Sequence, residues 1–269
     1  MTDPTSPILD RKHYARPSVF TPGNLLREAR RQKSIPFGKV PRICVLDPDG
    51  DLWRQLRDTG ARRSPYWACY HTELYEIELG GETLGVLGCA VGAPFAVLVA
   101  EELFASGCEF LISVTSAGQI VPSGKPPYFV FIERALRDEG TSYHYLAPAR
   151  YAYIPKLVMP LAQEAMQGLG NAVIGGSWTT DAPFRETEEA IALARSENLL
   201  AVEMEAAALY ALADVKGYSI LCVAHVTNLM AQLEHDFEKG EQSGNTALLA
   251  LISELVRIWQ LWHESMQPS

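Results

Sequence analysis

Residues 199–213 read Leu-Leu-Ala-Val-Glu-Met-Glu-Ala-Ala-Ala-Leu-Tyr-Ala-Leu-Ala, and this stretch decides the fold. Its apolar start is typical of a buried strand, and its alanine- and leucine-rich continuation is typical of a helix. Glu203 and Glu205 therefore lie where a strand end meets a helix start. A carboxylate among apolar side chains loses its hydration, so each acid needs hydrogen-bond partners or a changed protonation state.

Two interpretations of these acids are open. Both could cap the first helical turn, where the helix dipole favours negative charge. Alternatively, Glu205 could hold a vicinal diol through both carboxylate oxygens while Met204 covers the apolar face of the same sugar ring. We favour the second interpretation, because two acids that flank a methionine offer both polar and apolar contacts to one ligand.

Residues 202–207, Val-Glu-Met-Glu-Ala-Ala, resemble the ribose-binding signature of the nucleoside phosphorylase superfamily. That family includes purine nucleoside phosphorylases, uridine phosphorylases and methylthioadenosine nucleosidases. The resemblance implies that Glu205 binds the ribose hydroxyls and that Met204 packs on the sugar. Further segments that resemble the family follow in the expected order, at residues 46–48, 90–94, 115–118, 137–146 and 179–187.

The resemblance implies an α/β fold in which helices flank a central, mixed, largely parallel twisted sheet. A chain of 269 residues, 48% of them hydrophobic, can bury the core of one such domain. We expect this domain to span residues 23–269. Residues 1–22 are rich in Pro, Ser and Thr and predict an irregular N-terminal arm.

The amino-acid composition limits the kinds of binding partner and the cellular compartment that we expect for this chain. A formal net charge of −9 argues against nucleic acid, whose binding depends on neutralising phosphates with Lys and Arg, and favours a small molecule. Five cysteines without Cys-x-x-Cys spacing predict free thiols in a reducing cytoplasm. We expect no membrane contact, because no signal segment and no bilayer-length apolar run occurs. Because the histidines are scattered along the chain, we expect no metal site. For His235 and Asp236 we expect a solvated turn.

Two segments are expected to surround the sugar. Gly92 precedes a predicted helix, whose N-terminus is suited to an anion or a sugar hydroxyl. Small residues follow the buried strand at 110–114, and backbone N–H groups with hydroxyls at such a strand end can meet a ligand. These residues are Thr115, Ser116, Ala117 and Gly118.

The base is expected to lie between two other segments. The resemblance implies that the loop at 179–186, which holds Thr180 and Asp181, closes over the base and that Phe184 stacks on it. Phe184 could instead anchor the loop in the core, and Arg185 could contact a base carbonyl or pair with a surface acid. Asn228 takes the family's base-binding position if Val-Thr-Asn aligns with Val-Ser-Asp, whereas a shifted alignment places His225 in the pocket.

The phosphate side departs from the family pattern. The resemblance implies a Gly-Asp-Pro-x-Arg loop, but Leu46 and Gly50 stand where its glycine and arginine would be, in a predicted turn over residues 48–51. Ser113 stands at the position of a second phosphate-binding arginine. Both replacements remove the bidentate contacts that phosphate normally requires.

Three hypotheses follow. In a phosphorylase, Thr115, Ser116, His71 and the helix start at Gly92 would hold phosphate, helped by a cation such as Arg27, Arg30 or Arg31. In a hydrolase, water would replace phosphate and Glu203 would be the base. In a non-catalytic protein, only nucleoside binding would remain.

We predict phosphorolysis, giving free base and pentose 1-phosphate, on the evidence of the branch that the chain resembles. Glu205, Asn228 and Glu203 are the catalytic candidates. Phosphate would be a co-substrate, and no other cofactor is expected. Because the relatives build their pockets at subunit contacts, we also expect a homo-oligomer, a dimer or larger.

Overall fold

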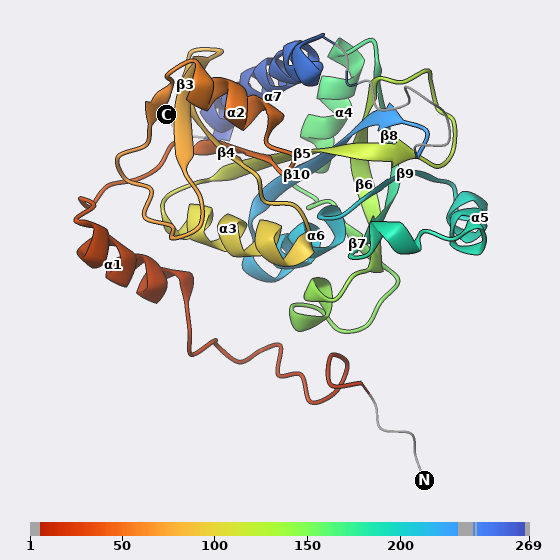
Figure 1. Ribbon diagram of the computed structural model, residues 1–269, viewed down its shortest axis with the longest axis horizontal. Coiled ribbons are helices and arrows are strands. Elements are labelled where there is room, and N and C mark those ends of the chain that lie inside the picture. Colours follow the sequence, from red (N-terminus) through yellow and green to blue (C-terminus); the bar gives the residue numbers. More distant parts are fainter. Residues whose placement is uncertain (1–5, 231–238, 240, 267–269) are drawn as a thin grey trace.

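The computed structural model describes residues 6–230, 239 and 241–266, in which ten strands form one sheet (Figure 1). The strands are β1 (Ile43–Asp47), β2 (Arg62–Arg63), β3 (Leu74–Leu79), β4 (Glu82–Gly88), β5 (Phe110–Gln119), β6 (Tyr128–Asp138), β7 (Tyr151–Tyr153), β8 (Ala172–Thr180), β9 (Leu199–Glu203) and β10 (Ser219–Asn228). The helices are α1 (Pro22–Lys33), α2 (Asp51–Asp58), α3 (Ala93–Ala105), α4 (Met159–Gly168), α5 (Glu188–Ser196), α6 (Ala206–Lys216) and α7 (Asn245–Met266). Short 3-10 turns are η1 (Thr141–His144), η2 (Pro183–Arg185) and η3 (Glu241–Gly244).

The sheet is mixed, as expected. Strands β4, β1, β5 and β10 lie side by side and parallel, and β6, β8 and β9 form a second parallel set. Antiparallel pairings join the two sets, because β10 also pairs with β6 and β9 pairs with the end of β5. This part of the sheet therefore closes on itself, and the carboxyl ends of β1, β5 and β9 come near one another.

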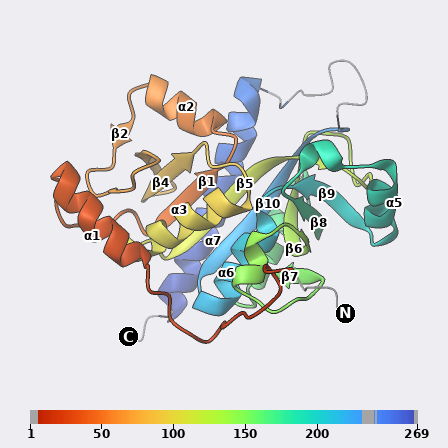
Figure 2. The same ribbon diagram turned by 60° about the horizontal axis from the view of Figure 1, so that its bottom comes forward.

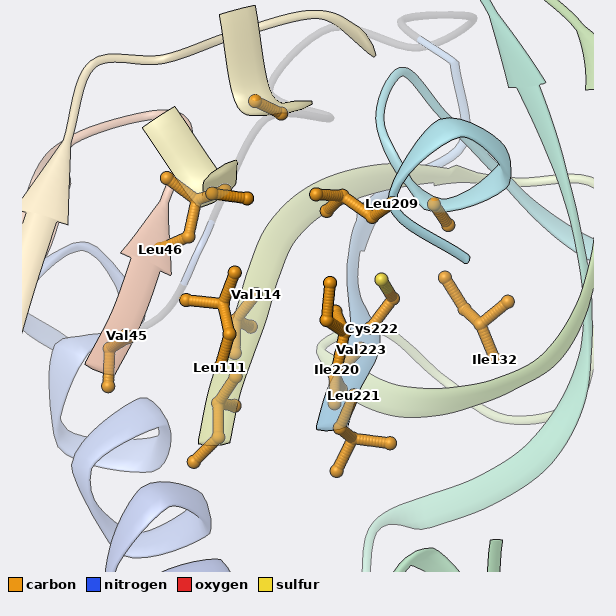
Figure 3. Close-up of a cluster of buried hydrophobic side chains, with 14 of the residues drawn as sticks. Val45, Leu46, Leu111, Val114, Ile132, Leu209, Ile220, Leu221, Cys222 and Val223 are labelled. Carbon is orange, nitrogen blue, oxygen red and sulfur yellow. The ribbon is translucent and has the colours of Figure 1, made fainter. Parts of the chain in front are cut away.

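Helices cover both faces of the sheet. Figure 1 shows α3 and α6 on one face and α4 and α7 on the other, and Figure 2 shows α3 and α6 in front of the strands. The central strands are buried on both sides, which explains their nearly continuous apolar sequence. Figure 3 shows part of this core, in which Leu209 of α6 faces side chains of β5 and β10 such as Val114 and Cys222.

The strand-to-helix reading of residues 199–213 is confirmed, because β9 ends at Glu203 and α6 begins at Ala206. The turn after β1 is also present at residues 48–49, but helix α2 follows it immediately, and its sequence had not indicated a helix. Strand β5 continues through residues 115–118, which had been expected to leave the strand.

Residues 6–21 contain neither helix nor strand, and the first helix starts at Pro22. This segment runs back to the turn η1 (Figure 2), where the Tyr14 hydroxyl donates to the Tyr143 carbonyl at 3.3 Å. Within the described ranges, no helix combines the length and the apolar character that crossing a bilayer requires. The expected turn at His235 and Asp236 lies outside the described residues.

Candidate active site

Glu205 is positioned by the junction between β9 and α6. It is the N-cap residue of α6, and only 1% of its surface is exposed. One carboxylate oxygen accepts a hydrogen bond from the Gly92 amide at 2.7 Å, and the other accepts one from the Met204 amide at 3.3 Å. Gly92 caps α3 with a φ of 92°, a conformation that glycine adopts without strain.

The protonation of Glu205 is strongly perturbed. Burial, reinforced by the nearby charge of Glu203, raises the pKa of Glu205 to about 8, although hydrogen bonds from Gly92 and Thr115 oppose the shift. At neutral pH, below this pKa, Glu205 therefore carries a proton. A ligand with two adjacent hydroxyls would supply the donors that favour the ionised carboxylate.

Glu203 has a different environment, although it lies only two residues away. Its Oε1 accepts hydrogen bonds from the Ser177 hydroxyl at 3.0 Å and the Thr179 hydroxyl at 2.5 Å. Its Oε2 accepts from the amides of Glu205 and Ala206 at 2.7 and 2.8 Å. These bonds satisfy the start of α6, so the capping interpretation describes Glu203, and its side chain does not line the cavity in front of Glu205.

A cavity of about 590 Å³ opens in front of Glu205. It brings together eight of the predicted site residues, from β5, η2, the junction after β9, and the end of β10. These are Thr115, Ser116, Ala117, Gly118, Phe184, Met204, Glu205 and Asn228. The volume is in the range of small-molecule sites, and the carboxylate lies beside the methionine as expected for a sugar.

Phe184 and Asn228, the two residues predicted to contact the base, both line the cavity. Phe184 belongs to η2, and its side chain is 99% exposed, so it is not an anchor in the core of this chain. The Asn228 amide nitrogen donates to the Thr227 hydroxyl at 3.2 Å, and its oxygen accepts from the Met230 amide at 2.8 Å. These contacts orient the amide of Asn228 at the cavity wall.

Other predicted site residues lie outside the lining of this cavity. Gly92 contributes its amide to Glu205 but does not line the cavity, and Arg185 is exposed. Asp181 accepts a hydrogen bond from the Gly140 amide at 2.8 Å, and the Thr180 hydroxyl accepts one from the Ala182 amide at 3.2 Å. Both side chains therefore shape the loop.

The two candidate histidines are also absent from the lining. His71 is exposed between β2 and β3, and its nearest aromatic neighbours, Tyr70 and Phe95, lie with ring centroids at 6.4 Å. His225 is stacked on Phe129 at 4.6 Å, and burial lowers its pKa to about 4. His225 lines a smaller adjoining cavity instead, where it is neutral at pH 7.

Sequence reasoning missed three polar or sulfur-bearing residues of the cavity, namely Asp49, Glu186 and Met230. Asp49 follows the carboxyl end of β1, next to the carboxyl end of β5. Its Oδ2 accepts a hydrogen bond from the Ser116 amide at 2.8 Å. The available signal was the position of an acid directly after a buried parallel strand, where ligands commonly bind.

Cations of this chain do not line the cavity. No Lys or Arg occurs among its lining residues in the described part of the chain. In α1, Arg27 and Arg31 pair with Glu28, and Arg30 donates to the Tyr66 carbonyl at 3.0 Å. Among the described residues, no group of three or more His, Cys, Asp or Glu side chains is arranged to hold a metal ion.

Comparison with known proteins gives a consistent result. The family model described as "Phosphorylase superfamily" matches residues 42–257. A uridine phosphorylase of Thermococcus kodakarensis is 30% identical over 255 residues, which cover 86% of each chain. A guanosine phosphorylase of Halorubrum lacusprofundi is 28% identical over 182 residues, which cover 67% of this chain and 70% of that protein.

Solved structures agree in fold. The crystal structure of a uridine phosphorylase from Vibrio fischeri superposes with a TM-score of 0.68 at 20% identity, covering 81% of this chain and 90% of that one. At this identity the likeness concerns the fold. The matched region includes the β9–α6 junction and the end of β5.

Proposed function

Because this chain belongs to the phosphorylase superfamily, we propose that it cleaves the N-glycosidic bond of a nucleoside. The single observation that carries this proposal is Glu205, a buried carboxylate that opens onto a ligand-sized cavity beside Met204. Its oxygens are oriented by the Gly92 and Met204 amides. Such a preorganised acid is suited to accept hydrogen bonds from two adjacent sugar hydroxyls.

The other lining residues support a division of the cavity into two parts. The pentose would lie on Glu205 and Met204, and the base between Phe184 and Asn228. During cleavage the sugar becomes cation-like while the base leaves with the bonding electrons. Glu205 would stabilise the charged sugar, and the Asn228 amide would hydrogen-bond to a base that accepts the negative charge itself.

The acceptor of the pentosyl group can be phosphate or water. The names of the relatives favour phosphate, which would give free base and pentose 1-phosphate. One specific observation favours water: the carboxylate of Asp49 already accepts the hydrogen bond of the Ser116 amide, which phosphate would otherwise accept. A protein that binds nucleosides without cleaving them is the outcome in which neither acceptor supports release of base.

We expect purified protein to release free base from at least one member of a panel of purine and pyrimidine ribosides and deoxyribosides. The panel is measured with phosphate and in phosphate-free buffer, and the sugar product is identified as pentose or pentose 1-phosphate. Absence of base release from every nucleoside in both buffers would refute the proposed function. The panel also identifies the base and the sugar that the cavity prefers.

Phe184→Ala is expected to raise KM about five- to tenfold while changing kcat less, because stacking contributes about 1 kcal/mol beyond burial and positions the base. The matched control is Leu193→Ala, which removes another exposed apolar side chain, from the nearby α5. An unchanged KM in the Phe184 variant would mean that this ring does not contact the base.

We also propose a homo-oligomer in the cytoplasm, with no cofactor beyond the acceptor. Support for an oligomer comes from large apolar side chains that one chain leaves exposed. Val19 is 98% exposed and Phe20 is 70% exposed, both just before α1. Sedimentation analysis of the purified protein tests this expectation.

A further inference from the structure

We propose that the pentosyl acceptor at this site is water and that Asp49 is the general base that activates it. The inference rests on the proposed nucleoside cleavage and specifies its acceptor. It starts from one contact, the hydrogen bond from the Ser116 amide to Asp49 Oδ2 at 2.8 Å. The Ser116 amide therefore already donates its hydrogen bond to a carboxylate of the same chain. It is not available to a phosphate that would receive the pentosyl group.

The position of Asp49 is set by the sheet. Strand β1 pairs in parallel with β5, with Leu46 opposite Ser113, so the residues that follow β1 reach the end of β5. The side chain of Asp49 is 29% exposed, and it lines the same cavity as Met204 and Glu205. Asp49 therefore faces the place where the sugar is expected, and water can reach its carboxylate.

The charges around Asp49 disfavour phosphate. The smaller cavity that shares Asp49, Thr115 and Ser116 with the main one is also lined by Asp47 and Asp51. Lys239 lies there too, but its Nζ is 2.6 Å from Asp51 and 3.4 Å from Asp49, so its charge is already paired. A phosphate dianion placed here would meet several carboxylates without an arginine among the lining residues of either cavity in the described chain.

Glu203, the base expected from the sequence, is less suited to this role than Asp49. Both its oxygens are occupied, by two hydroxyls of β8 and two amides at the start of α6, and it lies outside the cavity lining. Asp49 accepts the Ser116 amide hydrogen bond, lies 3.4 Å from Lys239 Nζ, and keeps part of its carboxylate exposed to solvent. Of the two acids, only Asp49 lines the cavity.

The proposed step is balanced with water as the co-reactant. A water oxygen attacks the anomeric carbon as the bond from that carbon to the base nitrogen breaks, and the bonding electron pair leaves with the base. Asp49 accepts the proton that the water loses, and later releases it to solvent. The leaving base takes up a proton from solvent, so the products are free base and free pentose.

The first test uses the wild-type protein and a nucleoside that it cleaves. We expect free pentose as the sugar product in phosphate-free buffer, and no increase in rate when inorganic phosphate is added. Release of base only with phosphate, with pentose 1-phosphate as the product, would overturn the role of water but leave nucleoside cleavage standing. Absence of any release would instead overturn the proposed function.

The second test uses Asp49→Asn, whose amide oxygen can still accept the Ser116 hydrogen bond. We expect kcat in phosphate-free buffer to fall by about 100-fold or more, the range typical of a lost general base. The matched control, Asp58→Asn, removes the same charge from the exposed end of α2, outside the lining of both cavities, and is expected to retain kcat within about threefold.

Nucleoside binding by each variant, measured at equilibrium, shows whether the cavity remains intact. Retained binding with lost turnover supports Asp49 as the base. Wild-type turnover of Asp49→Asn would refute it. If Asp49→Asn fails to fold, the product analysis of the wild-type protein still decides between water and phosphate.

Discussion

Glu205→Gln is expected to reduce kcat/KM for the preferred nucleoside by about 100-fold or more. The substitution keeps the size of the side chain but replaces one acceptor oxygen with a donor and removes the charge that supports a cation-like sugar. A hydrogen bond to a charged group is worth about 1.5–3 kcal/mol, so weakening two such bonds gives a loss of this size. Steady-state kinetics on the cleaved nucleoside measure it.

The control for this experiment is Glu188→Gln, which removes a charge from the exposed first turn of α5. It is expected to leave kcat/KM within about twofold, since a solvent-exposed charge that does not line the cavity is strongly screened. Wild-type kinetics of Glu205→Gln would remove Glu205 from the mechanism and with it the basis of the proposed function.

The raised pKa of Glu205 leads us to expect that kcat/KM depends on pH. Since the pKa of Glu205 is about 8, kcat/KM should rise about tenfold per pH unit up to that value and then level off. Glu205→Gln should abolish this limb of the profile. Because the folded chain holds this proton more tightly than the unfolded chain, the Glu205 contribution to stability should fall as pH rises from 4.5 to about 8.

Glu203→Ala is expected to lower the free energy of unfolding by about 3–5 kcal/mol, the largest stability change among these variants. The Ser177 and Thr179 hydroxyls can rotate to other partners. The amides of Glu205 and Ala206 cannot, because the start of α6 fixes them, so they would be buried without acceptors. Denaturant unfolding of the purified variant measures the change.

The matched control is Asp214→Ala, which removes an exposed acid from the same helix and should change stability by less than about 0.5 kcal/mol. A similarly small change in Glu203→Ala would show that the four hydrogen bonds of Glu203 contribute little to stability. The role of Glu205 would be unaffected by that result, since the two carboxylates have different partners.

Much of the fold could be predicted because its signals are local. The change from an apolar run to an alanine-rich helix placed the junction of β9 and α6 correctly, and the Gly-Ala-Pro sequence placed the start of α3. Helix α2 was missed because Pro48 and Gly50 favour a turn, and the short helix behind them depends on packing against β1 and β4.

The sequence alone therefore determined the strand-to-helix junction, the family resemblance and the presence of two acids at that junction. Only the tertiary structure decided which acid bonds to the start of the helix and which lines the cavity. Strand β9 ends at Glu203, and the two side chains then have different partners: Glu203 accepts hydrogen bonds from the amides of Glu205 and Ala206 at the start of α6, whereas Glu205 reaches Gly92, 113 residues away in the chain. The contact of Asp49 with Ser116, 67 residues apart, likewise depends on the register of β1 against β5, which no local pattern specifies.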